Sequence, residues 1–117
     1  MKFLLDTHAF LWWVTDSLLL SQWARDIIGD GNCELFRSAA SSWEVAIKYE
    51  LGRLPLPEAP ELFIPTELAK NRIDALPISR EHSFRAGKLP LLHRDPFDRM
   101  LIAQAQVENM ETITNDR

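Results

Sequence analysis

The sequence predicts an α/β fold built on a mainly parallel sheet, and three observations support this class. Short apolar segments alternate along the chain with longer segments of helical periodicity, which is the pattern of consecutive βαβ units. The 117 residues suit one domain, residues 1–117, and no internal repeat or linker divides them. With 46% hydrophobic and 26% charged residues, the composition is that of a globular protein with a sizeable core.

Four segments are predicted strands. Each is short, largely apolar and bounded by polar residues or turn formers. They are Lys2 to Leu5, Glu34 to Ser38, Ile73 to Ile78 and Glu111 to Thr114. Helical segments separate them, so crossover connections are expected and the strands should run mainly parallel.

Six segments are predicted helices, from their apolar periodicity and their end signals. They are Thr7 to Val14, Ser21 to Ile28, Ser41 to Leu51, Glu61 to Asn71, Ser79 to Lys88 and Pro96 to Glu108. Thr7 is the expected cap of the first helix, with Asp6 as the alternative. In the third helix, Trp43, Ile47 and Leu51 lie at i, i+4 and i+8 and predict its buried face.

Charge and cysteine content exclude several classes of protein. A net charge of −4 argues against nucleic-acid binding through a broad basic surface. The single cysteine, Cys33, excludes an internal disulfide and a cysteine-rich zinc site, and it agrees with a reducing cytoplasm. No apolar run reaches the roughly 18 residues of a membrane span, and the first residues lack a signal-peptide layout.

Acidic residues are placed where ligands bind in a parallel α/β sheet, beyond the carboxyl ends of the strands. Asp6 directly follows the first predicted strand, and Asp116 lies just past the last one. Glu44 lies near the start of the helix after the second strand. Asp98 lies in the first turn of the last helix, and reaches the same edge only if the loop before that helix leaves it there.

Each acid also has a purely local explanation. Asp6 can cap a helix, and Asp116 can be a solvated charge near the chain end. Glu44 and Lys48 form an i, i+4 pair worth about 0.2–0.5 kcal/mol on an exposed face. In the stretch HRDPFDRMLIAQ, Asp95 suits the N-cap and Asp98 the first turn, where an acid complements the helix dipole. The joint pattern of converging acids carries the functional interpretation.

Converging carboxylates require a counter-ion. Two of them about 5 Å apart repel by about 3 kcal/mol at an effective dielectric constant of about 20. A divalent cation removes this repulsion, and an all-oxygen ligand set favours Mg²⁺ or Mn²⁺ over zinc. Such a cation suits the hydrolysis of phosphate esters, because it activates water and neutralises charge on phosphate oxygens.

Four sequence motifs occur in order along the chain: KFLLDTHAFLWW, SSWEVAIK followed by LGRL, HRDPFDRMLIAQA and ITND. Together they resemble the PIN-domain ribonucleases, in particular the VapC-type toxins of prokaryotic toxin–antitoxin modules. The resemblance covers essentially the whole chain. It implies a three-layer fold, with a sheet of four or five strands and helices on both faces. Relatives usually continue into a fifth strand, whereas this chain stops at Arg117.

The resemblance also implies a function and a set of site residues. The family's four acids match Asp6, Glu44, Asp98 and Asp116. The implied activity is Mg²⁺- or Mn²⁺-dependent hydrolysis of RNA, which leaves 5′-phosphate and 3′-hydroxyl ends. The implied assembly is a cytoplasmic homodimer inhibited by a cognate antitoxin.

Other residues are candidates for supporting roles. Thr7 or Thr114 could orient a carboxylate through a hydrogen bond, and Asp95 is the expected helix cap. Candidates for phosphate contacts are Arg94, Arg99 and Lys48, although an ordinary solvated charge explains each of them equally well.

The histidines, the tryptophans and a proline-rich segment suggest further interpretations. His8 and His93 flank two of the acids; contact with phosphate or a capping role is favoured for them over metal-free cleavage of RNA, because they have no obvious partner arrangement. Trp12 and Trp13 cannot both face the core from one helix, so one of them is expected at an interface. The segment from Leu54 to Ile64 could line a groove for a partner or pack into the core.

Two rival functions remain open. A receiver domain of a signalling protein is also α/β and binds Mg²⁺, but it needs an acidic pair after its first strand and a lysine after its last. Asp6 stands alone, and no such lysine follows Thr114. The other rival is a non-catalytic interaction module with the PIN fold.

Overall fold

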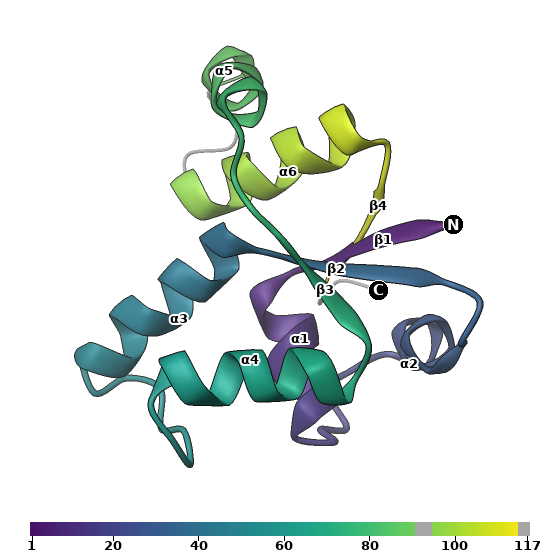
Figure 1. The fold of residues 1–117 in the computed structure, drawn as a ribbon, viewed down its shortest axis with the longest axis vertical. Coiled ribbons are helices and arrows are strands. Elements are labelled where there is room, and N and C mark those ends of the chain that lie inside the picture. Colours follow the sequence, from purple (N-terminus) through teal and green to yellow (C-terminus); the bar gives the residue numbers. More distant parts are fainter. Residues whose placement is uncertain (91–94, 115–117) are drawn as a thin grey trace.

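A computed structural model describes residues 1–90 and 95–114 of the chain (Figure 1). Its elements are β1 (Lys2–Leu5), α1 (Thr7–Val14), α2 (Gln22–Gly29), β2 (Glu34–Ser38), α3 (Ala39–Glu50), α4 (Pro60–Lys70), β3 (Ile73–Leu76), α5 (Arg80–Lys88), α6 (Pro96–Glu108) and β4 (Glu111–Ile113). The longest of these helices, α6, has 13 residues, and none in the described ranges meets the length and hydropathy of a membrane span.

The described strands form one parallel sheet in the order β3-β2-β1-β4. In the centre of the sheet, Leu4 of β1 pairs with Phe36 of β2 on one side and with Thr112 of β4 on the other. The predicted α/β class with a parallel sheet is therefore confirmed. Because all four strands point the same way, their carboxyl ends share one edge of the sheet, and the loops and helices that leave it meet there.

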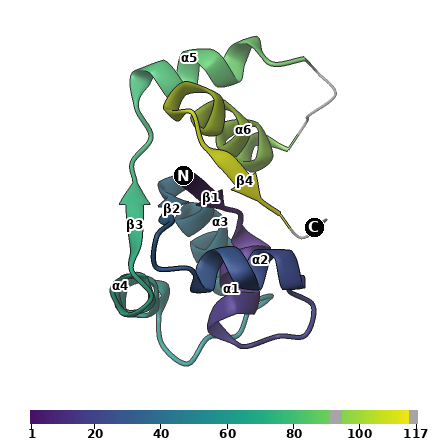
Figure 2. The same cartoon turned by 90° about the vertical axis from the view of Figure 1, so that its right-hand side faces the viewer.

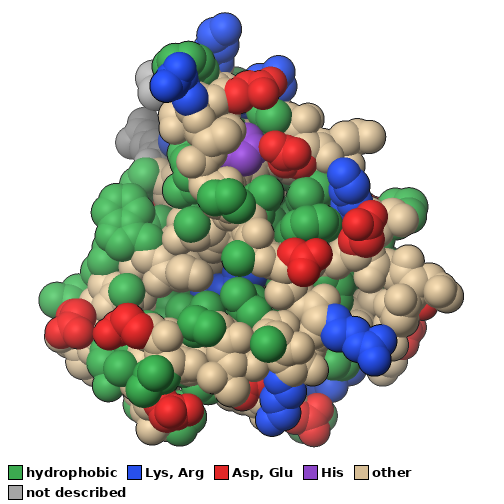
Figure 3. Space-filling model, viewed as in Figure 1, with side chains coloured by type: hydrophobic (Ala, Val, Ile, Leu, Met, Phe, Trp, Pro, Cys, Tyr) green, Lys and Arg blue, Asp and Glu red, His purple; other side chains and the backbone are tan. Residues whose placement is uncertain are grey.

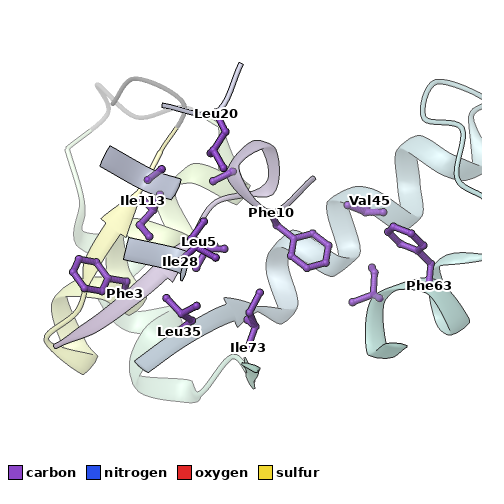
Figure 4. Packing of buried hydrophobic residues seen from close by; sticks show 13 residues of the cluster. Phe3, Leu5, Phe10, Leu20, Ile28, Leu35, Val45, Phe63, Ile73 and Ile113 are labelled. Atoms are coloured by element: carbon purple, nitrogen blue, oxygen red, sulfur yellow. The ribbon is translucent and has the colours of Figure 1, made fainter. Parts of the chain in front are cut away.

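Helices cover both faces of the sheet, which confirms the expected three layers (Figure 2). One face packs under α1, α2 and α4, and the other under α6, with α5 lying against α6. The larger core lies on the first face, where Phe10 of α1 packs between the sheet and the side chains of Val45 and Phe63 (Figure 4). The smaller core joins Leu4 to Leu101 of α6.

Several element ends differ from the sequence-based expectation by a few residues. Asp6, not Thr7, is the N-cap of α1, so the first choice of cap was wrong and the alternative is confirmed. Helix α3 begins at Ala39, two residues early, because the Ser38 hydroxyl accepts a hydrogen bond from the Ala40 amide. Strand β3 ends at Leu76, before a proline that cannot donate to the ladder.

The predicted buried face of α3 is wrong. Trp43 and Leu51 are each 61% exposed, and Ile47 is 37% exposed. The residues of α3 that are buried are Ala40, Ser41 and Val45, whose small side chains allow close packing. The apolar stripe of α3 therefore faces outward, and hydrophobic side chains gather on this flank of the molecule (Figure 3).

Candidate active site

Asp6 lies at the carboxyl end of β1, where the chain turns into α1. Its Oδ1 accepts a hydrogen bond from the Ala9 amide at 2.7 Å, which caps the helix. Its own amide donates to the carbonyl of Ile113 at 3.0 Å, so the end of β4 reaches Asp6. Asp6 therefore both caps α1 and lies at the carboxyl edge of the sheet. Its side chain bonds to the first turn of α1, and its backbone amide bonds to the end of β4.

Glu44 is held from two sides in the second turn of α3. The hydroxyl of Thr7 donates to its Oε1 at 2.7 Å, and Lys48 Nζ lies 2.8 Å from its Oε2. The glutamate side chain is only 15% exposed. This is therefore a partly buried carboxylate, not the exposed ion pair that the local explanation assumed. The hydrogen bond predicted from Thr7 to a carboxylate is confirmed, and it joins α1 to α3.

Asp98 lies in the first turn of α6, and that helix starts beside α3. Asp95 is the N-cap as predicted, because its Oδ1 accepts bonds from the amides of Phe97 at 2.8 Å and of Asp98 at 3.3 Å. The Phe97 ring lies edge-on to Trp43, with ring centroids 5.2 Å apart. Trp43 precedes Glu44 in the chain, so the first turn of α6 lies beside the part of α3 that carries Glu44. Asp98 is exposed there.

Three predicted residues, Asp116, Arg94 and His93, lie outside the described ranges. Thr114 is described and half-buried, directly after the strand that meets Asp6. The structure thus joins Thr7, which follows Asp6 in the chain, to Glu44, and it places the first turn of α6 beside α3. The roles of Thr114 and of the fourth acid remain predictions.

The residue that the sequence-based analysis missed is Arg37. It lies near the carboxyl end of β2, between Leu5 and Ala75, and is 1% exposed. Burial lowers the pKa of its guanidinium to about 10, while the negative charges of Glu44 and Asp6 act in the opposite direction. The signal was present in the sequence: Arg37 lies two positions after Leu35, on the inward-facing register of a buried strand.

The donor chemistry of the site suits a hard divalent cation, because its candidate ligands are all carboxylate oxygens. Within residues 1–90 and 95–114, no three His, Cys, Asp or Glu side chains form a group that could hold a metal ion. Asp116, the fourth acid of the predicted set, lies outside these residues, so the complete ligand set remains a prediction.

The predicted phosphate contacts have different surroundings. Lys48 is 41% exposed and is paired with Glu44, so its charge lies at the rim of the site. Arg99 instead donates to the backbone carbonyls of Ala86, Leu89 and Pro90, at 2.6–3.0 Å. Those bonds hold the end of α5 against α6 and argue for a structural role of Arg99, which corrects its description as a solvated charge.

A groove of about 550 Å³ opens beside Thr7 and Lys48. Its walls come from α1, from α4 and from the proline-rich segment that precedes α4. They include Trp12, whose ring lies tilted against His8 with centroids 5.6 Å apart. Leu54 and Leu56 line the groove and also pack against the core, so the core interpretation of their segment is confirmed and a partner in the groove remains a prediction.

Comparison with known families identifies the class of protein. The PIN domain family matches residues 3–117, so this chain belongs to that family. It is 39% identical over 64 residues to Ribonuclease VapC16 of Mycobacterium tuberculosis. That alignment covers 55% of this chain and 44% of the relative, so the chain matches less than half of the length of that protein.

Solved structures show the same fold at low identity. A toxin–antitoxin complex from Klebsiella pneumoniae aligns with a TM-score of 0.60 and 17% identity, over 95% of this chain and 83% of that one. VapBC2 from Rickettsia felis, bound to a DNA fragment from its promoter, aligns with a TM-score of 0.67 and 16% identity, over 98% and 95%. The likeness supports the three-layer α/β fold.

Proposed function

We propose that this chain is a Mg²⁺- or Mn²⁺-dependent endoribonuclease that acts in the cytoplasm as the toxin of a toxin–antitoxin pair. The observation that carries the proposal is the bond from Thr7 to Glu44, which holds a partly buried acid beside Asp6 at the carboxyl edge of the sheet. Membership of the PIN family and the similarity to a named ribonuclease support it. Family membership also argues against the receiver alternative.

The proposed cation ligands are Asp6, Glu44, Asp98 and Asp116, bound directly or through water. When bound, Mg²⁺ or Mn²⁺ supplies activation of water and stabilisation of charge on the phosphate oxygens. The protein supplies the geometry. Thr7 fixes the rotamer of Glu44, and Lys48 balances its charge at the rim.

The experiment is cleavage of a mixed RNA pool by the purified chain, with Mg²⁺, with Mn²⁺ and with EDTA. The proposal expects cleavage that requires a divalent cation and leaves 5′-phosphate ends. Cleavage that persists in EDTA would favour metal-free catalysis by histidines. No cleavage under any condition would favour the non-catalytic interaction module.

We propose that the antitoxin binds the groove beside Thr7. The groove walls combine the apolar side chains of Trp12, Leu54 and Leu56 with two cations, Lys48 and Arg53. An antitoxin segment with apolar and acidic residues would match both features, and its position would block access to Glu44. Leu56→Glu is expected to weaken antitoxin binding in a pull-down and to leave RNA cleavage intact. Unchanged binding would contradict this location.

We propose that the exposed face of α3 joins two copies of the chain. Trp43, Ile47 and Leu51 form an apolar stripe that extends to Phe97 of α6. Monomeric proteins rarely expose such a contiguous patch, and the family resemblance implies a homodimer. Leu51→Glu is expected to halve the mass measured by light scattering during size-exclusion chromatography. A wild-type chain that elutes as a monomer would contradict the dimer.

A further inference from the structure

The buried guanidinium of Arg37 has neither a hydrogen-bond partner nor an ion-pair partner in the described part of the chain. Its Nε, Nη1 and Nη2 atoms are buried and donate no hydrogen bond, and it forms no ion pair there. Its planar group lies over the ring of Phe10, 4.0 Å from the ring centroid. Buried charges are normally paired and hydrogen-bonded, because removing them from water is costly. Arg37 therefore needs an explanation other than the stability of the fold.

The position of Arg37 links it to the proposed active site. Its neighbour in the sheet is Leu5, and Asp6 follows Leu5 directly. Glu44 lies on the helix that leaves the end of β2. The negative charges of Glu44 and Asp6 favour the charged guanidinium and so raise its pKa against the effect of burial, and the guanidinium forms no hydrogen bond to either acid. Because an electrostatic interaction acts equally on both charges, the positive charge of Arg37 also acts on any cation that binds between these acids.

We propose that Arg37 is a fixed positive charge behind Asp6 and Glu44 that weakens the affinity of the site for divalent cations. This inference rests on the proposed function, since it concerns the same cation. Arg37 touches no substrate and acts through the field that it places on the site. Coulomb's law gives about a tenfold effect on affinity for a unit charge about 10 Å from a divalent cation, at an effective dielectric constant of about 50.

A charge role and a packing role of Arg37 predict different cation affinities and different melting temperatures for the Arg37→Met variant. Methionine fills much of the same volume and can pack on Phe10, but carries no charge. Replacing a buried charge by an apolar group is often neutral or stabilising. The proposal therefore expects tighter cation binding with no loss of thermal stability. A packing role alone would lower the melting temperature and leave cation affinity unchanged.

The test is calorimetric titration of Mn²⁺ into the full chain after removal of metals with EDTA, together with thermal unfolding in EDTA. We expect the Kd of Arg37→Met to fall about tenfold, as the Coulomb estimate gives. Arg37→Lys, which keeps the charge, should retain the wild-type Kd. The matched control is Arg72→Met, which removes an arginine next to the amino end of β3, at the opposite edge of the sheet, and should also leave the Kd unchanged.

The outcomes separate this inference from the proposed function. If wild type binds no Mn²⁺, the metal-dependent function fails and the inference fails with it. If wild type binds and folded Arg37→Met binds equally or more weakly, the inference is overturned and the function stands. Arg37→Gln, which also removes the charge, decides the matter if the methionine variant does not fold. Unfolding of both neutral variants would assign Arg37 a structural role and overturn the proposal.

Discussion

Asp98→Asn is expected to reduce RNA cleavage at least a hundredfold. Losing a residue that only hydrogen-bonds to a metal ligand costs roughly ten- to hundredfold, and losing a ligand itself should cost more. The change keeps the shape of the side chain and removes the charge that a divalent cation requires. Asp98 is exposed in the first turn of α6, so the free energy of unfolding should fall by no more than about 1 kcal/mol. Cleavage of labelled RNA in Mn²⁺ and chemical denaturation measure the two effects.

Asp95→Asn provides the matched control on the same helix. Asparagine is as good an N-cap as aspartate, so it can still accept the amide hydrogen bonds of Phe97 and Asp98. This variant should therefore keep both stability and cleavage close to wild type. If Asp98→Asn cleaves as well as Asp95→Asn does, Asp98 is only a helix-start acid, and the family correspondence fails at this position.

Thr7→Val is expected to lower cleavage by about ten- to hundredfold, the usual cost of removing a group that orients a metal ligand. Valine has nearly the shape of threonine but cannot donate to Glu44, whose Oε1 then loses its 2.7 Å bond. The free energy of unfolding should fall by about 1–3 kcal/mol, as for a hydrogen bond to a charged group. The loss should appear mainly in kcat, because Thr7 positions an acid and contacts no substrate.

Two further variants test this assignment. Thr7→Ser retains the donor and should restore most of the cleavage. Thr15→Val removes a hydroxyl that donates to the Leu11 carbonyl at the exposed end of the same helix, so it should leave cleavage unchanged. An inactive Thr7→Ser variant with normal stability would show that the hydroxyl is not what matters at this position.

The order and class of the elements could be predicted because they depend on local signals. Apolar runs, capping residues such as Ser21 and Ser79, and the proline that starts α6 act within a few residues of the chain. Asp6 was placed correctly for the same reason, since the end of a parallel strand fixes which edge of the sheet it occupies.

Features that depend on packing between distant segments were not predictable. The i, i+4, i+8 stripe of Trp43, Ile47 and Leu51 identified a helix, but periodicity does not say which face the rest of the chain covers. Burial of Arg37 likewise depends on Phe10 and on neighbouring strands far away in the sequence. The bond between Thr7 and Glu44 spans 37 positions, and the parallel-sheet rule placed both residues near one edge without specifying which carboxylate Thr7 would bond.

The most direct test of the central claim is paramagnetic broadening of backbone amide signals by Mn²⁺ in the isotope-labelled chain. We expect substoichiometric Mn²⁺ to broaden the signals of Asp6, Glu44 and Asp98 together. The internal control is the opposite edge of the sheet, where Glu34, Glu108 and Glu111 line one pocket and should keep sharp signals. Broadening at that edge instead, or at only one of the three proposed ligands, would contradict a shared cation site at the carboxyl ends of the strands.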